Sequence, residues 1–219
     1  MKVIGVIPIK MNNVRTPGKN TKPLCDGTPL IHLIQRTLLE SKRLNGVYVY
    51  CSNRDICDFL LPGVQYLPRS EEFDTPEADV IAMMDAFSRV VDADIYAQAH
   101  ATTPFLRAAS VDNAVSVVCS GNADSAFAVR KAQDFFWKDG VPVNYKPESI
   151  PRTQDMKPYY IETTGLYIYR KSIIQNFHRR VGFKPYLLEV SETEALDIDT
   201  PADFEIADAV YAYTQKCKR

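Results

Sequence analysis

Short apolar runs alternate along this chain with stretches in which apolar side chains recur at helical spacing. An apolar run bounded by polar residues predicts a buried strand, and the helical spacing predicts an amphipathic helix. The predicted strands cover residues 3–9, 47–51, 64–67, 94–99, 125–129, 166–169 and 186–190. The predicted helices cover residues 30–39, 78–91, 110–121, 172–177 and 201–215. This order predicts a single α/β domain over residues 1–219, with a mostly parallel, twisted sheet between two layers of helices.

The pattern changes in the second half of the chain. Residues 135–143 predict a β-hairpin that turns at Asp139-Gly140, and residues 144–158 are polar and rich in proline, which predicts a loop. We therefore expect a hairpin and loop extension at about residues 133–165. Further on, Leu196–Asp199 is predicted to end a strand, and Thr200 with Pro201 predicts the start of the last helix.

Composition and charge limit the classes of function. The hydrophobic content of 46%, the charged content of 24% and the net charge of −1 are typical of a soluble globular protein. They give no overall basic surface for nucleic acid and no polybasic tail for a membrane. The five cysteines lack metal-ligand spacing, and the apolar N-terminus is too short and lacks a small-residue cleavage site for a signal peptide. We expect reduced thiols and a cytoplasmic protein with no membrane or nucleic-acid partner.

The loop after the first strand is cationic. It contains four basic residues and no acidic residue before Asp26, and Gly18 permits a tight turn close to a ligand. Ligands of such sheets bind beyond the carboxyl ends of the strands, which is where this loop lies. The loop predicts a polyanion site, and a triphosphate is the ligand we favour; a solvated basic loop is the alternative. The basic residues are Lys10, Arg15, Lys19 and Lys22.

A pair of carboxylates lies at the end of a later predicted strand. Alternation along a strand would put Asp197 and Asp199 on one face, where their oxygens could bind Mg²⁺ together with water and substrate oxygens. The alternative is that Asp199 caps the helix that follows. A triphosphate needs cationic side chains and a divalent cation together, which favours the metal site.

Two further polar stretches predict a second substrate. Residues 98–107 follow a strand and offer hydrogen-bond donors to phosphate or sugar hydroxyls. His100 within this stretch could act as a base or only as a structural hydrogen-bonding residue. Within the extension, Arg152 and Gln154 could clamp a carboxylate, or they could belong to an ordinary polar surface loop.

These four stretches, in this order, resemble the acylneuraminate cytidylyltransferases, a family that includes the 3-deoxy-manno-octulosonate cytidylyltransferases. The loop of residues 9–20 is similar to the family pattern RxxSxRxPGKN, and residues 98–107 resemble QPTSPLR. Residues 152–158 resemble RxQDxP, and residues 197–204 match DIDTxxDF. The resemblance implies a sheet of the nucleotide-diphospho-sugar transferase type, CTP and Mg²⁺ as ligands, and the transfer of CMP to an acidic sugar with release of pyrophosphate.

The resemblance also implies a role for each matched residue. The nucleotide would be held by Pro8, Lys10, Asn13, Arg15, Gly18, Lys19 and Asn20. The metal would be bound by Asp197 and Asp199, and catalysis would rest on Lys19, Arg15 and Asp199. The acceptor would lie against Gln98, Thr102, Arg107, Arg152 and Gln154. A homodimer is implied as well, with residues near 135–145 crossing to the partner.

The chain departs from the family pattern at a few positions. Lys10 replaces an arginine and lacks its planar fork, Asn13 replaces a serine, and the third stretch carries an inserted His-Ala and Phe105. These differences concern the acceptor more than the nucleotide. A family enzyme with another acidic or phosphorylated acceptor remains an alternative, as do a metal-dependent glycosyltransferase and a non-catalytic nucleotide-binding module.

Overall fold

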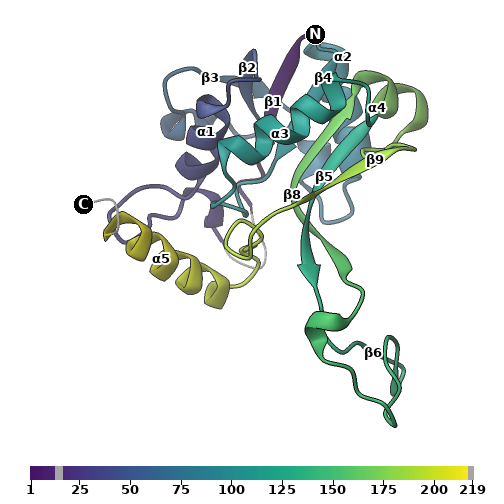
Figure 1. The fold of residues 1–219 in the computed structure, drawn as a ribbon. Coiled ribbons are helices and arrows are strands. Elements are labelled where there is room, and N and C mark those ends of the chain that lie inside the picture. The colour runs from purple at the N-terminus through teal and green to yellow at the C-terminus, as the bar shows by residue number, and fades with distance from the viewer. Residues whose placement is uncertain (13–16, 217–219) are drawn as a thin grey trace.

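The computed structural model describes residues 1–12 and 17–216 as one α/β unit with a projecting arm (Figure 1). The strands are β1 (Val3–Pro8), β2 (Gly46–Cys51), β3 (Val64–Pro68), β4 (Ile95–Ala99), β5 (Ser125–Ala132), β6 (Trp137–Lys138), β7 (Val141–Pro142), β8 (Tyr159–Arg170) and β9 (Pro185–Glu189). The helices are α1 (Ile31–Glu40), α2 (Val80–Val90), α3 (Ala108–Cys119), α4 (Lys171–Phe177) and α5 (Pro201–Lys216). Short 3₁₀ helices cover Lys19–Thr21, Arg54–Phe59, Glu71–Asp74 and Thr153–Asp155.

Seven strands form the main sheet in the order β3-β2-β1-β4-β8-β5-β9. All neighbouring strands are parallel except β8, which runs antiparallel to both β4 and β5. The predicted fold class, a mostly parallel sheet with helices on both faces, is confirmed. The sequence predicted a β8 of only four residues, at 166–169, whereas the strand has 12 residues, because its first part pairs with the end of β5 at the base of the arm.

Alternating side chains of the strands pack against the two helical layers. On one face, Ile7 of β1 belongs to a buried apolar cluster with residues of α1 and α3. On the other face, Val6 belongs to a cluster with residues of α2 and α4, which includes Tyr96 and Tyr169. Because both faces are covered, the central strands are apolar almost throughout, as buried parallel strands require.

The arm is the segment between β5 and β8, and it extends away from the sheet (Figure 1). Its tip contains the predicted hairpin: Trp137 pairs with Pro142 and Lys138 with Val141. Asp139 and Gly140 form the turn with positive φ values of 52° and 79°, as a two-residue hairpin turn requires. The hairpin expected at residues 135–143 is thus confirmed.

The last loop before α5 differs from the prediction. Leu196–Asp199 is not a strand but a loop. One residue of this loop, Ile198, donates its backbone N–H to the Thr102 carbonyl at 2.9 Å. The prediction of a strand ending at Asp199 is therefore wrong, because this segment pairs with a loop at one residue instead of with the sheet edge. The start of α5 at Pro201 is confirmed.

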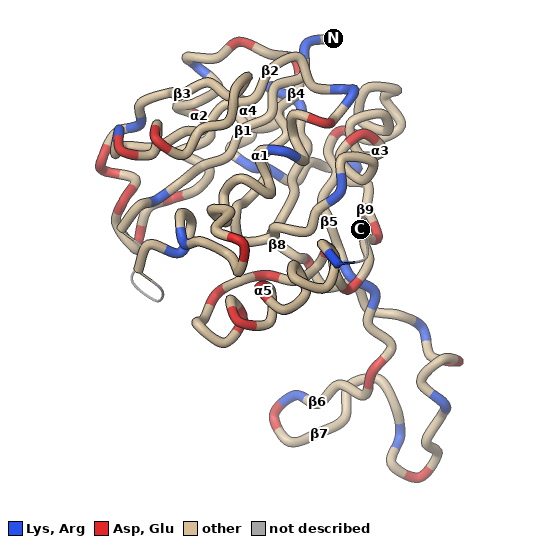
Figure 2. Tube along the Cα trace, turned by 90° about the vertical axis from the view of Figure 1, so that its left-hand side faces the viewer, with Lys and Arg blue, Asp and Glu red and all other residues tan. Residues whose placement is uncertain are grey.

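The distribution of charged residues in the structure agrees with the nearly balanced charge of the sequence. Lys, Arg, Asp and Glu are interspersed along the chain and do not gather by sign on one face (Figure 2). Among the described residues, no helix is both long and apolar enough to cross a membrane.

Candidate active site

The loop that follows β1, at residues 9–22 and called the β1 loop below, meets the loop before α5 beyond the carboxyl end of β1. Lys19 is almost fully buried, and its ammonium donates to the Ile198 carbonyl and lies 3.9 Å from Asp199 Oδ1. A buried lysine requires a charged or polar partner, and here the partners come from a segment 179 residues further along the chain. The tertiary structure thus joins the predicted phosphate loop to the predicted metal-binding segment.

The described part of the β1 loop is fixed at both ends. Pro8 ends β1, and Asn20 donates from Nδ2 to the Lys10 carbonyl at 2.9 Å, which ties the two sides of the loop together. Gly18 has a φ of 66° directly before the 3₁₀ turn that presents Lys19. This left-handed conformation favours glycine, so the turn depends on the residue that the motif places there. Asn13 and Arg15, which were also predicted to bind the nucleotide, lie outside the described residues.

Asp197 and Asp199 flank the buried Ile198. Asp197 Oδ2 accepts a hydrogen bond of 3.1 Å from the Thr164 hydroxyl, whereas its Oδ1 is buried and has no hydrogen-bond partner among the described residues. Thr164 itself has a φ of 58°, which is unusual for a β-branched residue and is typical of strained positions at functional sites. Asp199 is exposed and directs Oδ1 towards Lys19.

This pair of carboxylates fits a hard divalent cation. A buried carboxylate oxygen without a partner is costly unless something positive or hydrogen-bonding binds it. Within residues 1–12 and 17–216 there is no cluster of three or more His, Cys, Asp or Glu side chains that could hold a metal by itself. Two carboxylates that leave positions for water and substrate oxygens are the arrangement that Mg²⁺ takes in phosphate-transferring sites.

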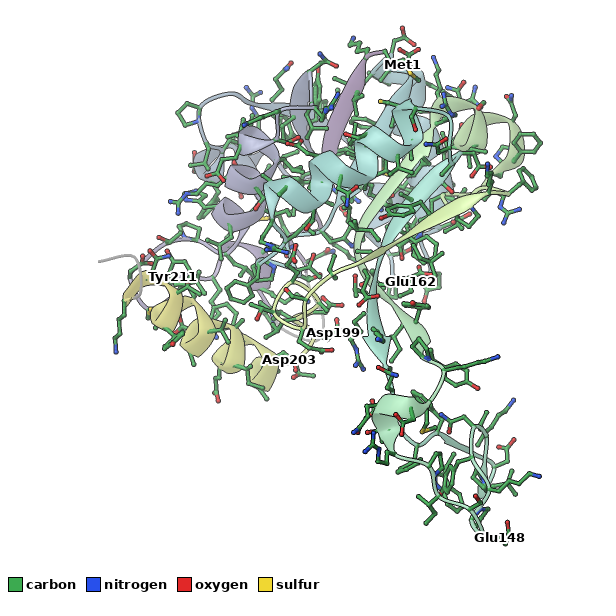
Figure 3. All side chains as sticks on the ribbon, viewed as in Figure 1. Met1, Glu148, Glu162, Asp199, Asp203 and Tyr211 are labelled. Atoms are coloured by element: carbon green, nitrogen blue, oxygen red, sulfur yellow. The ribbon has the colours of Figure 1, made fainter. Side chains whose placement is uncertain are left out.

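The helix-capping role belongs to a different carboxylate. Asp203 Oδ2 accepts hydrogen bonds from the Thr200 backbone N–H at 2.7 Å and from the Asp199 N–H at 3.1 Å. Figure 3 shows Asp199 and Asp203 together at the start of α5. These hydrogen bonds to Asp203 therefore fix the backbone conformation at Asp199 and Thr200.

A hydrogen-bonded chain of polar groups joins the end of β4, the loop after it and β8. Gln98 is fully buried; its amide nitrogen lies 2.8 Å from His100 Nε2, and its oxygen accepts from the Tyr169 hydroxyl at 3.2 Å. Burial, followed by the nearby charge of Arg180, lowers the pKa of His100 to about 4. The imidazole is therefore neutral at neutral pH, and Nε2 accepts from the Gln98 amide. Both ends of the Gln98 side chain are occupied inside the protein.

The other residues predicted in this loop have mainly structural contacts. Thr102 holds Ile198 through its backbone carbonyl. Arg107 precedes α3, and its guanidinium forms an ion pair of 2.7 Å with the buried Glu194, which also accepts from the Ser110 hydroxyl at 2.5 Å. The contact between Arg107 and Glu194 anchors the loop after β9 to the start of α3. It could not be predicted because Glu194 lies 87 residues away.

Arg152 and Gln154 lie on the arm. Arg152 is exposed and pairs with Asp155 at 2.9 Å, and the Gln154 carbonyl accepts from Gln133 Nε2 at 3.3 Å. Glu148 marks the far end of the arm, well separated from Asp199 in Figure 3. The structure does not bring these two residues to the Lys19–Asp199 group of the same chain.

An arginine that follows β3 was not predicted as a site residue. Arg69 is buried, forms an ion pair with Asp74 and lies 6.0 Å above the Tyr50 ring, while its Nε is buried without a hydrogen-bond partner in the described structure. The Ser52 hydroxyl, after β2, donates to the same aspartate. An arginine directly after a predicted strand was the signal that could have identified it, because that position also lies at the ligand edge.

A cleft opens where the loops after β1, β2 and β3 meet. It has a volume of about 580 Å³ and is lined mainly by polar side chains, among them Asn12, Ser52, Asn53 and Asp74. It therefore lies beside the β1 loop, on the side of the sheet edge that carries Arg69. This is a position in which a base or sugar could bind next to phosphates held by the loop.

Comparison with known proteins places the chain in a family. The profile of the cytidylyltransferases matches residues 4–217, which spans the β1 loop, the Asp197–Asp199 segment and everything between them. The chain belongs to the cytidylyltransferase family. The family membership expected from the four sequence stretches is confirmed.

Two relatives illustrate the range of this family. The chain is 28% identical over 202 residues to N-acylneuraminate cytidylyltransferase A of Danio rerio, which covers 88% of the chain but 46% of that protein. It is also 28% identical over 235 residues to the CMP-N,N'-diacetyllegionaminic acid synthase of Legionella pneumophila, with 99% of both chains covered. The chain thus spans about half the length of the fish relative and nearly the full length of the bacterial one.

Solved structures share the fold. A CMP:2-keto-3-deoxy-manno-octonic acid synthetase in complex with CTP aligns with a TM-score of 0.74 and 17% identity, over 98% of this chain and 100% of that one. The bifunctional IspDF of Campylobacter jejuni aligns with a TM-score of 0.69 and 11% identity, over 94% of this chain and 54% of that one. At these identities the likeness concerns the fold.

Proposed function

We propose that this protein transfers CMP from CTP to the hydroxyl of an acidic sugar and releases pyrophosphate. The family, the two relatives named for CMP-sugar synthesis and the polyanion loop support this proposal. The relatives favour a sialic-acid-like nonulosonic acid as the acceptor, and a 3-deoxy-octulosonic acid is the other acceptor that the sequence resemblance implies. The whole reaction, including its substrates, is an inference from these relations.

One observation carries the proposal: the ammonium of Lys19 lies against the Ile198 carbonyl and 3.9 Å from Asp199. A triphosphate brings several negative charges, which require cationic side chains and a divalent cation close to each other. The contact puts a cation of the β1 loop beside the carboxylate segment that fits such a metal. An ordinary solvated basic loop would have no reason to bury its lysine there.

The residues of the chain would position and neutralise the reactants. Lys10, Lys19 and Asn20 would hold the phosphates with Arg15 and Asn13, and Pro8 and Gly18 would shape the loop. Lys19 and Arg15 would balance the charge that develops on the leaving pyrophosphate as the acceptor oxygen attacks the α-phosphorus in line. His100, being neutral with a low pKa, would hold its place by hydrogen bonds and would not serve as the base.

Asp197 and Asp199 would hold Mg²⁺, for which the unpartnered Oδ1 of Asp197 is the supporting observation. When bound, the ion would neutralise phosphate oxygens and lower the pKa of a hydroxyl that it contacts. Thr164 would keep the Asp197 carboxylate in one orientation through its hydroxyl.

A homodimer built through the arm completes the proposal. The arm carries several large apolar side chains that are exposed in the single chain, and such a concentration is typical of a protein interface. If the arm crosses to a second copy, Arg152 and Gln154 would lie beside the partner's acceptor site. The exposed apolar residues are Phe135, Trp137, Val141, Val143 and Ile150 of the arm, together with Tyr159 and Tyr160 at the start of β8.

A cytoplasmic location is part of the same proposal. Four of the five cysteines lie within the described residues and all four are free, as in most proteins of reducing compartments.

The test is a pyrophosphate-release assay. It would cross the four ribonucleoside triphosphates with N-acetylneuraminic acid, 3-deoxy-manno-octulosonic acid, N,N'-diacetyllegionaminic acid and a set of phosphorylated acceptors, in the presence of Mg²⁺. We expect release with CTP and an acidic sugar only, and the CMP-sugar product should be visible by mass spectrometry.

The other outcomes discriminate between the alternatives. Release of pyrophosphate only with a phosphorylated acceptor would indicate an enzyme of the same family that acts on a phosphorylated acceptor instead of an acidic sugar. Consumption of a nucleotide sugar without pyrophosphate release would indicate a glycosyltransferase. Binding of CTP with no release for any acceptor would indicate a non-catalytic module.

A further inference from the structure

Arg180, in the loop between α4 and β9, is held unusually firmly for an arginine near the surface. Its guanidinium stacks on the Tyr167 ring at 3.6 Å from the ring centre, and Nη2 donates to the Tyr167 hydroxyl at 2.8 Å. The same nitrogen lies 3.5 Å from the Glu162 carboxylate, which also accepts a hydrogen bond from Tyr167. The side chain of Arg180 remains 21% exposed, so solvent still reaches it.

Tyr167 and Glu162 orient the guanidinium of Arg180. Tyr167 and Glu162 both act on Nη2, which fixes the plane of the guanidinium. An arginine held in this way can present the remaining N–H groups of its planar fork in a fixed direction. Preorganisation of this kind lowers the entropy lost when an anion binds.

The fixed charge lies next to the proposed active site. Tyr167, on which the guanidinium stacks, pairs with Gln98 at the carboxyl end of β4, and the charge of Arg180 contributes to the lowered pKa of His100. From there the chain leads in two residues to Thr102, whose carbonyl binds Ile198. On β8, Glu162 lies two residues before Thr164, whose hydroxyl binds Asp197. Figure 3 shows Glu162 on β8, where the arm joins the body.

The contacts of this cluster are separate from those of the proposed triphosphate site. Lys19 and the β1 loop form one side of the Asp197–Asp199 segment, and Arg180 approaches the region from the α2 and α4 face of the sheet, where Tyr167 and Tyr169 are buried. Since the proposed function assigns the phosphates to the β1 loop, an anionic group bound by Arg180 would come from the other substrate.

We infer that Arg180 binds the carboxylate of the acceptor in the same chain, and that Tyr167 and Glu162 are positioning residues that orient its guanidinium. The inference rests on the proposed function, because it requires an acidic acceptor. It assigns the acceptor's charge to a residue of the body, whereas the sequence placed that role on Arg152 of the arm. Planar guanidinium and carboxylate groups match in a bidentate geometry, which distinguishes an acid from its neutral ester.

The test compares an acid with its methyl ester. Calorimetric titrations would use CTP-loaded protein without divalent cation, and N-acetylneuraminic acid, 3-deoxy-manno-octulosonic acid and N,N'-diacetyllegionaminic acid as probes, each with its methyl ester. The variants are Arg180→Gln and Arg180→Lys, with Arg179→Gln as the matched control. Arg179 is the exposed neighbour whose guanidinium lies 4.7 Å from the Phe183 ring. The melting temperature and the affinity for CTP verify that each variant is folded.

We expect the wild type to prefer an acid over its ester, and Arg180→Gln to weaken binding of the acid by about 10- to 100-fold and remove that preference. Arg180→Lys, which retains the charge without the fork and guards against misfolding of the glutamine variant, should lose part of the preference. Tyr167→Phe should lower it less, and Arg179→Gln should behave as the wild type.

Three results would overturn the inference: an Arg180→Gln variant that keeps the preference, a loss of preference in Arg152→Gln instead, or a wild type that binds none of the acids. Pyrophosphate release by the wild type separates this failure from failure of the proposed function. Release with an acid, together with an unaltered Arg180→Gln preference, would leave the cytidylyltransferase function standing without the role of Arg180.

Discussion

Lys19 shows how a single side chain can link two distant parts of a sequence. Its burial would be unfavourable without the Ile198 carbonyl and the nearby Asp199 carboxylate, and those partners come from the opposite end of the chain. The motif predicted a lysine for phosphate binding, and the fold adds that this lysine also holds the carboxylate segment in place.

We therefore predict two effects for Lys19→Ala. Loss of the cation should reduce kcat/KM for CTP by about 100-fold or more, as expected when a group that stabilises developing charge is removed. The variant should also unfold at a lower temperature, because the Ile198 carbonyl loses its partner. Steady-state kinetics and a thermal melt measure both effects, with Lys42→Ala, an exposed lysine outside the loop, as the control. A lower melting temperature with unchanged kinetics would contradict the phosphate role.

Thr164 combines a left-handed backbone with a hydrogen bond to Asp197. A β-branched residue is strained in this region, so the position retains threonine at a cost in stability. The hydroxyl gives a reason for that cost, since it orients one of the two proposed metal ligands.

For Thr164→Val we expect the strain to remain and only the hydrogen bond to be lost. Binding of Mn²⁺, followed by electron paramagnetic resonance in the presence of CTP, should weaken by about 5- to 10-fold, in keeping with the loss of one hydrogen bond to a charged group. Thr164→Ser, which retains the hydroxyl, should bind Mn²⁺ as the wild type does. If the serine variant is weakened as much as the valine variant, the hydroxyl is not what orients Asp197.

Helix α5 begins at Pro201, as the sequence pattern predicted. Thr200, Pro201 and Asp203 form a local start signal whose contacts span only a few residues, so the pattern alone was sufficient. The segment just before it was predicted wrongly as a strand, because a non-local contact with Thr102 decides its conformation.

Asp203→Ala should lower the free energy of unfolding by about 1 kcal/mol, the usual effect of removing a capping side chain. Hydrogen bonds, the first from the Thr200 backbone, lower the pKa of Asp203 below its ordinary value of 3.8. Its contribution is therefore present above pH 3.8 and is lost as the pH falls through the lower pKa of the folded state. Urea unfolding at neutral and acidic pH tests this, with the exposed Glu205→Ala as the control; equal stability of wild type and Asp203→Ala at neutral pH would refute the capping role.

At the scale of the whole molecule, the arm is what a single chain leaves unexplained. It carries exposed apolar side chains and two of the predicted acceptor residues, yet it projects away from the Lys19–Asp199 group. A second copy of the chain that packs against the arm would cover the exposed apolar side chains. The two predicted acceptor residues of the arm would then lie beside the active site of that second copy.

A mixing experiment distinguishes this arrangement from a site built within one chain. Asp199→Asn should be nearly inactive alone, and Arg152→Gln should be strongly impaired because Arg152 would border the partner's acceptor pocket. If the arm acts on the partner, the mixed dimer contains one site with both residues intact, so refolding the two variants together should restore up to about a quarter of the wild-type activity. Sedimentation should show a species of twice 24.7 kDa. A monomer, or no recovery on mixing, would contradict the trans arrangement.

The sequence by itself determined the α/β class, the hairpin at Asp139-Gly140, the start of α5 and the family, because these depend on local periodicity, turn chemistry and ordered motifs. The tertiary structure decided which charges meet: Lys19 with Asp199, Arg107 with Glu194, and Arg180 with Tyr167 and Glu162. Lys19 and Glu194 meet their partners across 179 and 87 residues, and Arg180 reaches Tyr167 because the loop between α4 and β9 folds back on β8; the sequence pattern contains no signal for such contacts.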